Sequence, residues 1–150
     1  HAACLELVAQ LKLESVVTFT GKVNVKEWLA RLDLNVLTSV SESQPLVILE
    51  AAAAGVPSVA SDVGACRELL EGRTSEDAAL GPSGLITPVV SPDATAEAIV
   101  ALARDPDRHA AMAAAGIERV TRFYHQDAVL RYYRRLYAHL AAPAVLKGGA

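Results

Sequence analysis

Two glutamates, Glu42 and Glu50, stand eight positions apart near the middle of the chain and carry its most informative chemistry. Glu42 lies in a short polar loop, and Glu50 is the only charge in the apolar helix expected after that loop. A charge buried in an apolar helix is costly without a hydrogen-bond donor, and ribose hydroxyls would serve Glu50 as donors. Glu42 stands at the mouth of the helix, where its carboxylate can accept hydrogen bonds from sugar hydroxyls.

The helix that carries Glu50 is expected to begin near Pro45. Proline suits a first helical turn because its missing N–H would have no partner within the helix. The free N–H groups of that turn and the positive end of the helix dipole favour an anion such as a diphosphate. The spacing alone leaves a second interpretation equally open. In that interpretation Glu42 complements the helix dipole from the loop, and Glu50 is solvated or salt-bridged.

Short strand-like runs alternate with longer helical runs, and these elements must position the two glutamates. Strands separated by helices indicate right-handed βαβ units and an α/β fold with a parallel sheet. Such a sheet binds ligands beyond the carboxyl ends of its strands, here just after Thr20, Thr38 and Ser61. Apolar and β-branched runs predict strands over residues 16–20, 34–38, 57–61 and 84–88. Helical periodicity predicts helices over residues 5–13, 25–32, 45–54, 65–70, 93–104, 106–123 and 127–140, with a long polar loop over 71–82.

Composition narrows the classes of protein that the chain can belong to. A length of 150 residues with 52% hydrophobic residues predicts a single domain, and a net charge of -3 argues against a nucleic-acid partner. No apolar run approaches the length of a membrane span, and no signal peptide is visible. Cys4 and Cys66 are too few for a disulfide scaffold, which predicts a reduced, cytoplasmic protein. The histidines lack metal-ligand spacing, and Cys66 is best explained by core packing.

The stretch around the two glutamates resembles the signature of glycosyltransferase family 4. In that signature two glutamates separated by seven residues run into an alanine- and glycine-containing segment, as Glu42 and Glu50 do into residues 51–62, and residues 63–69 continue the match. The resemblance implies the Rossmann-like C-terminal half of a GT-B fold, which binds the donor. The amino-acid sequence of residues 41–50 and 79–82 is similar to that of the pel exopolysaccharide glycosyltransferase subgroup.

The resemblance also implies a reaction and a set of site residues. The intact enzyme would move a hexose with retention from a nucleotide sugar, UDP-glucose, to an acceptor in exopolysaccharide synthesis, without a metal or other cofactor. Glu42 would be the catalytic residue beside the donor sugar, and Glu50 would bind the ribose. Ser43 stands where the family usually has glycine, so its side chain is expected to crowd the donor or to alter the turn. The other donor-binding residues would be Gly21, Lys22 and Val23 against the base, and Ser43, Gln44, Pro45 and Leu46 around the sugar and diphosphate.

By the same resemblance, residues 1–150 form one truncated domain that lacks its first two strands. The N-terminal acceptor domain and a basic pair for the phosphates would also be missing, so we expect the isolated chain to be inactive. Without those strands, residues 16–20 must pair directly with 34–38, come away from the sheet or borrow strands from another chain. We expect a rearranged four-stranded sheet or a strand-swapped homo-oligomer. Two alternatives remain: a non-catalytic association module, in which both glutamates face solvent or salt bridges, and half of a GT-B-like sugar-nucleotide epimerase.

Overall fold

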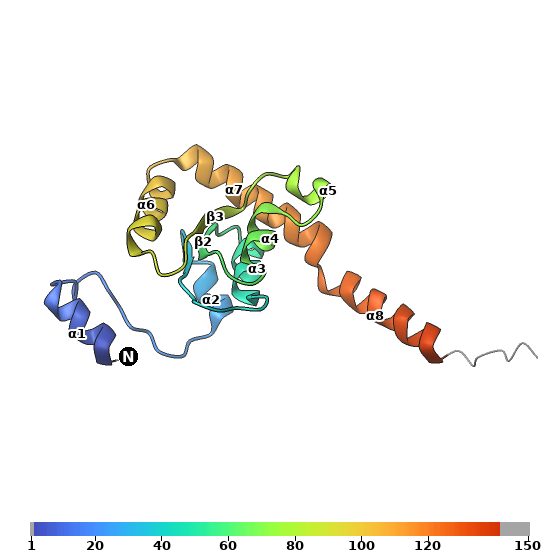
Figure 1. Ribbon diagram of the computed structural model, residues 1–150, viewed down its shortest axis with the longest axis horizontal. Helices are drawn as coiled ribbons and strands as arrows, with labels where there is room; N and C mark the ends of the chain where they lie inside the picture. Colours follow the sequence, from blue (N-terminus) through green and yellow to red (C-terminus); the bar gives the residue numbers. More distant parts are fainter. Residues whose placement is uncertain (1, 142–150) are drawn as a thin grey trace, which may run out of the picture.

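The computed structural model (Figure 1) describes residues 2–141. Three parallel strands form one sheet in the order β1-β2-β3. The strands are β1 (Asn35–Leu37), β2 (Ser58–Ser61) and β3 (Gly84–Thr87). In the central strand, Val59 is the register partner of Val36 on one side and of Leu85 on the other. Because all three strands run in the same direction, the loops that follow them emerge at one edge of the sheet. The predicted parallel sheet flanked by helices is therefore confirmed.

Helices precede, connect and follow the strands. Proline occupies the first turn of both α6 and α7, and the Asp105 side chain caps α7 by accepting a hydrogen bond from the Arg108 N–H at 2.9 Å. These caps explain why the chain breaks between the two helices at the predicted place. The helices are α1 (Ala2–Gln10), α2 (Val25–Leu29), α3 (Leu46–Ala53), α4 (Cys66–Glu71), α5 (Ser75–Ala78), α6 (Pro92–Ala103), α7 (Pro106–Arg119), the π-helix η1 (Val120–Tyr124) and α8 (Gln126–Ala141).

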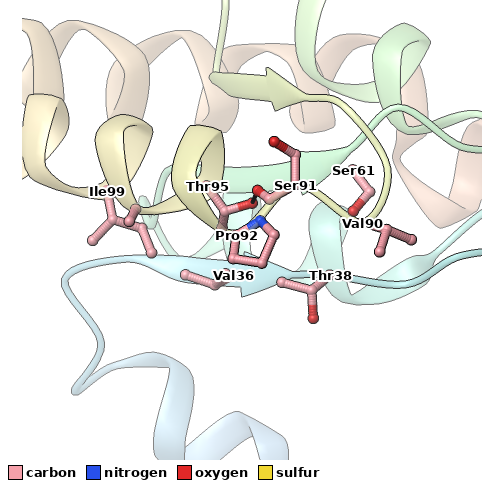
Figure 2. A pocket seen from close by; sticks show the side chains of 9 residues that line it. Val36, Thr38, Ser61, Val90, Ser91, Pro92, Thr95 and Ile99 are labelled. Carbon is pink, nitrogen blue, oxygen red and sulfur yellow. Dashed lines mark hydrogen bonds between the residues drawn. The ribbon is translucent and has the colours of Figure 1, made fainter.

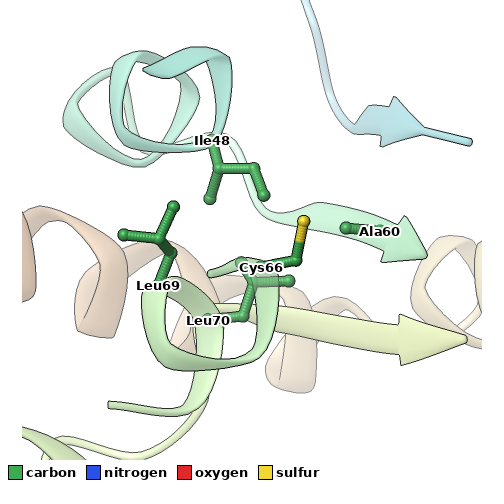
Figure 3. Close-up of a cluster of buried hydrophobic side chains, with 5 residues drawn as sticks. All are labelled: Ile48, Ala60, Cys66, Leu69 and Leu70. Atoms are coloured by element: carbon green, nitrogen blue, oxygen red, sulfur yellow. The ribbon is translucent and has the colours of Figure 1, made fainter. Parts of the chain in front are cut away.

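The core has one layer of helices on each face of the sheet. Alternate residues of a strand point to opposite faces, so neighbouring residues of β2 meet different helices. Val59 packs with Leu102 of α6 and Met112 of α7. On the other face, Ala60 packs in one cluster with Ile48 of α3. The cluster also holds three side chains of α4, and Figure 3 shows them: Cys66, Leu69 and Leu70. The second cluster fixes α3 and α4 against the sheet, and both helices begin at its carboxyl edge.

A buried ion pair joins the end of α7 to α5. The Arg119 side chain is 1% exposed, and its Nε donates to Oδ1 of Asp77 at 2.6 Å. Its remaining N–H groups donate to three backbone carbonyls, those of Leu70 at 2.9 Å, Asp77 at 3.2 Å and Gly81 at 2.7 Å. This hydrogen bonding satisfies the buried charge and ties residues 70–81 to the end of α7.

The predicted strand over residues 16–20 is wrong, and so is the rearranged four-stranded sheet. This segment belongs to neither a strand nor a helix, and Val16 is 73% exposed. Its first N–H groups instead close a turn, with Val16 and Val17 both donating to the carbonyl of Leu13. β-Branched residues form a strand only where a neighbouring strand accepts their backbone groups, and no strand of the sheet pairs with this segment. A strand-swapped oligomer stays a prediction.

Two further differences concern the second half of the chain. The predicted helix over 106–123 changes from α to π geometry at Val120, and the predicted polar loop over 71–82 contains the short helix α5. Thr74 explains α5, because its side chain accepts a hydrogen bond from the Asp77 N–H and caps the helix. None of the helices within residues 2–141 is long and apolar enough to cross a membrane.

Candidate functional site

Glu42 lies in the loop that follows β1 at the carboxyl edge of the sheet. Its carboxylate is half-buried, and its Oε1 accepts a hydrogen bond from the Ser39 hydroxyl at 2.7 Å. A hydrogen bond from a neutral donor to a carboxylate is short and comparatively strong, so it fixes the direction of the side chain. One oxygen of Glu42 is thereby held, and the other can accept a hydrogen bond from a ligand. Ser39 was not among the predicted site residues.

The start of α3 lies directly beyond Glu42. Pro45 is the N-cap residue of α3 rather than its first helical residue, and the cap makes no side-chain hydrogen bond to the first turn. Ser43, Gln44 and Leu46 are exposed around this start, whereas Pro45 is buried. The positive end of the helix dipole therefore lies among residues that are exposed at the surface. This geometry suits a phosphate or another anion.

Glu50 lies one turn further along α3, and its side chain is exposed. This face of the helix is open, as the 63% exposure of Leu46 also shows, and the binding of a ribose by Glu50 stays a prediction. Among residues 2–141, no ion pair or side-chain hydrogen bond engages the Glu50 carboxylate. Exposure to solvent is what the association-module alternative expects of Glu50, but Glu42 meets that expectation only in part, since Ser39 holds it.

Ser43, which replaces the glycine usual in the resembled family, adopts an ordinary backbone conformation. Within the described part of the chain, Lys12 and Val90 are the non-glycine residues with positive φ. The turn at Ser43 therefore does not require glycine for its backbone angles. Whether the Ser43 side chain crowds a bound donor stays a prediction.

Gly21, Lys22 and Val23 lie on the segment that leads into α2. Gly21 has a φ of +63° and is exposed, as is Lys22, while Val23 is half-buried. Leu29 of α2 joins Ala51 of α3 and Val56 in one cluster of buried residues. No hydrogen bond or ion pair in the described structure joins residues 21–23 to the Glu42–Glu50 stretch. The structure thus brings the predicted residues of 42–50 together around one loop and one helix, and it leaves 21–23 on a separate segment.

The loop between β2 and α4 is hydrogen-bonded to the Glu42 loop. The Ala65 N–H donates to the carbonyl oxygen of Ser43 at 2.9 Å. Cys66 follows in the core under this contact, where burial raises the pKa of its thiol and the nearby Glu42 charge raises it further. A thiol with a raised pKa holds its proton and is a weak nucleophile. The expectation that Cys66 is a packing residue is therefore confirmed.

A cavity of about 450 Å³ lies at the same edge of the sheet, on the face that α6 covers (Figure 2). Thr38, Ser61 and Ser91 line it together with the apolar residues Val36 and Ile99. Thr38 and Ser61 end two of the predicted strands beyond which a ligand is expected, but none of the other predicted site residues lines the cavity. No group of three metal-ligating side chains occurs among residues 2–141.

The chain is similar to known proteins over most of its length. A family model described as "Glycosyl transferases group 1" matches residues 2–105. An N-acetyl-alpha-D-glucosaminyl L-malate synthase from Bacillus anthracis is 33% identical over 134 residues, which are 89% of this chain and 33% of that protein. The lipopolysaccharide core biosynthesis mannosyltransferase LpsB from Rhizobium meliloti is 35% identical over 136 residues, 90% of this chain and 37% of that protein. The chain thus spans about a third of the length of these curated relatives.

Solved structures show the same fold. A sucrose-phosphate synthase from Thermosynechococcus elongatus superposes with a TM-score of 0.80 at 28% identity, over 91% of this chain and 33% of the other. Anabaena HepE, solved in complex with UDP-glucose, superposes with a TM-score of 0.77 at 24% identity, over 91% of this chain and 36% of the other. The parallel sheet and its helices are therefore those of the C-terminal half of a GT-B fold.

Proposed function

This chain belongs to the glycosyl transferases group 1 family, and from that premise we propose that it is the donor-binding domain of a retaining hexosyltransferase. The observation that carries the proposal is the start of α3, with Glu42 just before it and Glu50 one turn into it. The donor would be UDP-glucose, bound without a metal ion, and the intact enzyme would act in exopolysaccharide synthesis as in the pel subgroup. HepE, whose structure contains UDP-glucose, supports this choice of donor.

The proposed mechanism assigns each part of the donor to one part of the site. The diphosphate lies at the first turn of α3, where backbone N–H groups and the helix dipole stabilise its charge. That stabilisation increases as the sugar leaves and negative charge builds on the diphosphate. Glu50 accepts hydrogen bonds from the ribose, and Glu42 accepts them from the hexose. Gly21, Lys22 and Val23 cover the base, which requires their segment to approach α3 in the bound state.

Calorimetric titration of UDP and UDP-glucose into the purified chain tests the proposal. We expect saturable binding of both ligands, weakened about tenfold by Glu50→Ala, since the loss of hydrogen bonds to a charged group costs about 1.5–3 kcal/mol. Glu97→Ala is the matched control, because Glu97 is an exposed glutamate on α6, on the other face of the sheet. A wild-type chain that binds neither ligand would refute donor binding. Equal weakening by Glu50→Ala and Glu97→Ala would refute the assignment of Glu50.

A titration with ADP-glucose, GDP-mannose and UDP-N-acetylglucosamine then tests the identity of the donor. We expect UDP-glucose to bind more tightly than all three. Tighter binding of another nucleotide sugar would keep the donor-binding function and replace the proposed donor.

A further inference from the structure

Gly64, in the turn between β2 and α4, lies against the backbone of the Glu42 loop. It has a φ of +52°, and a Cβ built on it would lie 2.3 Å from the carbonyl oxygen of Glu42 and 2.6 Å from that of Ser43. Contacts this short would force one of the two loops to move. Glycine is therefore required here both for its conformation and for the close approach of the two loops.

The contact is continued by a hydrogen bond that anchors the Glu42 loop to α4. The Ala65 N–H donates to the Ser43 carbonyl at 2.9 Å, and the Ala65 carbonyl in turn accepts from the Leu69 N–H of α4 at 3.0 Å. Both groups belong to the backbone, so the anchor depends on the position of the loop rather than on a side chain. Without Gly64 the two loops could not come close enough to form it.

Ser39 completes the arrangement at the side chain. Its hydroxyl is half-buried and donates to Oε1 of Glu42 at 2.7 Å, over a separation of three residues within the same loop. Gly64 thus allows the backbone of Glu42 to lie close to the turn before α4, and Ser39 fixes the direction of the Glu42 carboxylate. Neither residue lies at the start of α3, where the diphosphate would bind.

We infer that Ser39 and Gly64 are positioning residues that hold Glu42 for the sugar of the donor. The inference rests on the proposed function, in which Glu42 contacts the hexose and the rest of the site contacts the nucleotide. It follows that loss of the Ser39 hydroxyl weakens binding of the nucleotide sugar and leaves binding of the bare nucleotide almost unchanged. A residue with a purely structural role would weaken both.

Calorimetry with UDP and UDP-glucose on Ser39→Ala and Ser39→Thr makes this distinction. We expect Ser39→Ala to weaken UDP-glucose binding about fivefold, because the ligand must then order the freed Glu42 side chain, and to weaken UDP binding less than twofold. Ser39→Thr keeps the hydroxyl and should restore most of the affinity. Equal weakening of both ligands, or no change with UDP-glucose, would overturn the inference while leaving the proposed function standing. A wild-type chain that binds neither ligand would overturn both.

Gly64→Ala tests the backbone contact, with Gly81→Ala as its matched control. Gly81 also has a positive φ, of +82°, but a Cβ built there meets no atom within 4 Å. The control therefore adds backbone strain without a clash. We expect Gly64→Ala to lose UDP-glucose affinity at least tenfold relative to Gly81→Ala, with circular dichroism showing both folded. Equal affinities would overturn the role of Gly64, and if Gly64→Ala unfolds, the Ser39 variants decide the inference.

Discussion

Replacing Arg119 with methionine should cost the fold more stability than any substitution of an exposed ion-pair residue. The change removes all four hydrogen bonds of the guanidinium group and keeps a side chain of similar length. Asp77, only 2% exposed, would keep a carboxylate whose remaining partner is the Arg73 N–H at 3.0 Å. Breaking a buried pair in this way costs about 3–5 kcal/mol. That is a large share of the free energy of unfolding of a typical domain, which is about 5–15 kcal/mol.

Urea unfolding followed by circular dichroism measures this cost. With a slope of about 1–3 kcal/mol per molar urea, the midpoint should fall by about 2 M while the slope stays constant. Arg122→Met is the matched control, because Arg122 pairs with Glu76 at the surface, where the two side chains are 39% and 67% exposed. An exposed pair contributes about 0–1 kcal/mol. If Arg119→Met lowers the midpoint no more than Arg122→Met does, the reasoning from burial is wrong.

Further predictions concern the same ion pair, the two cysteines and Gly84. The double variant Asp77→Leu/Arg119→Met should cost less than the sum of the single variants, measured by the same urea unfolding, because no unpaired charge remains. Exposed Cys4 should react quickly with a thiol reagent at pH 8, whereas buried Cys66 should react only as the chain opens. Burial raises the pKa of Cys66 above 9.0, so the free energy of unfolding should fall as the pH rises past 9.0. The fall should be smaller in Cys66→Ala. Gly84→Ala, whose Cβ would lie 2.1 Å from the Ser58 carbonyl, should abolish cooperative unfolding.

The sequence predicts the three strands of the sheet well because each has an apolar or β-branched composition and also pairs with a neighbouring strand. β1, β2 and β3 lie inside the predicted runs, and each is followed by a loop or turn at the carboxyl edge. Residues 16–20 have the same β-branched composition and form no strand. The difference is not local, because a strand needs a neighbour for its backbone groups, and that neighbour cannot be read from the segment itself.

The candidate site divides in a similar way. Glu42 and Glu50 are visible in the sequence because their spacing belongs to a motif, and the start of α3 is visible through Pro45. The exposure of Glu50 is not visible, since an apolar helix alone does not show which of its faces a neighbour covers. Ser39 and Gly64 act through contacts of one particular atom, a hydroxyl in one case and an absent Cβ in the other. Such contacts depend on a geometry of a few ångströms that spacing does not determine.

The helix α4 connects the backbone anchor of the Glu42 loop to the buried Arg119–Asp77 pair, and the sequence revealed neither. At its beginning, Ala65 holds the Ser43 carbonyl, and near its end, the Leu70 carbonyl accepts hydrogen bonds from Arg119 at 2.9 Å and from the Ser83 N–H at 2.8 Å. A six-residue helix is too short to be stable alone, so these contacts and the core beneath it must hold it in place. Loosening the Arg119 end should therefore loosen the Glu42 loop as well. A folded Arg119→Lys variant, measured at a temperature well below its unfolding midpoint, should bind UDP-glucose more weakly than wild type. Unchanged binding would show that the core alone fixes α4.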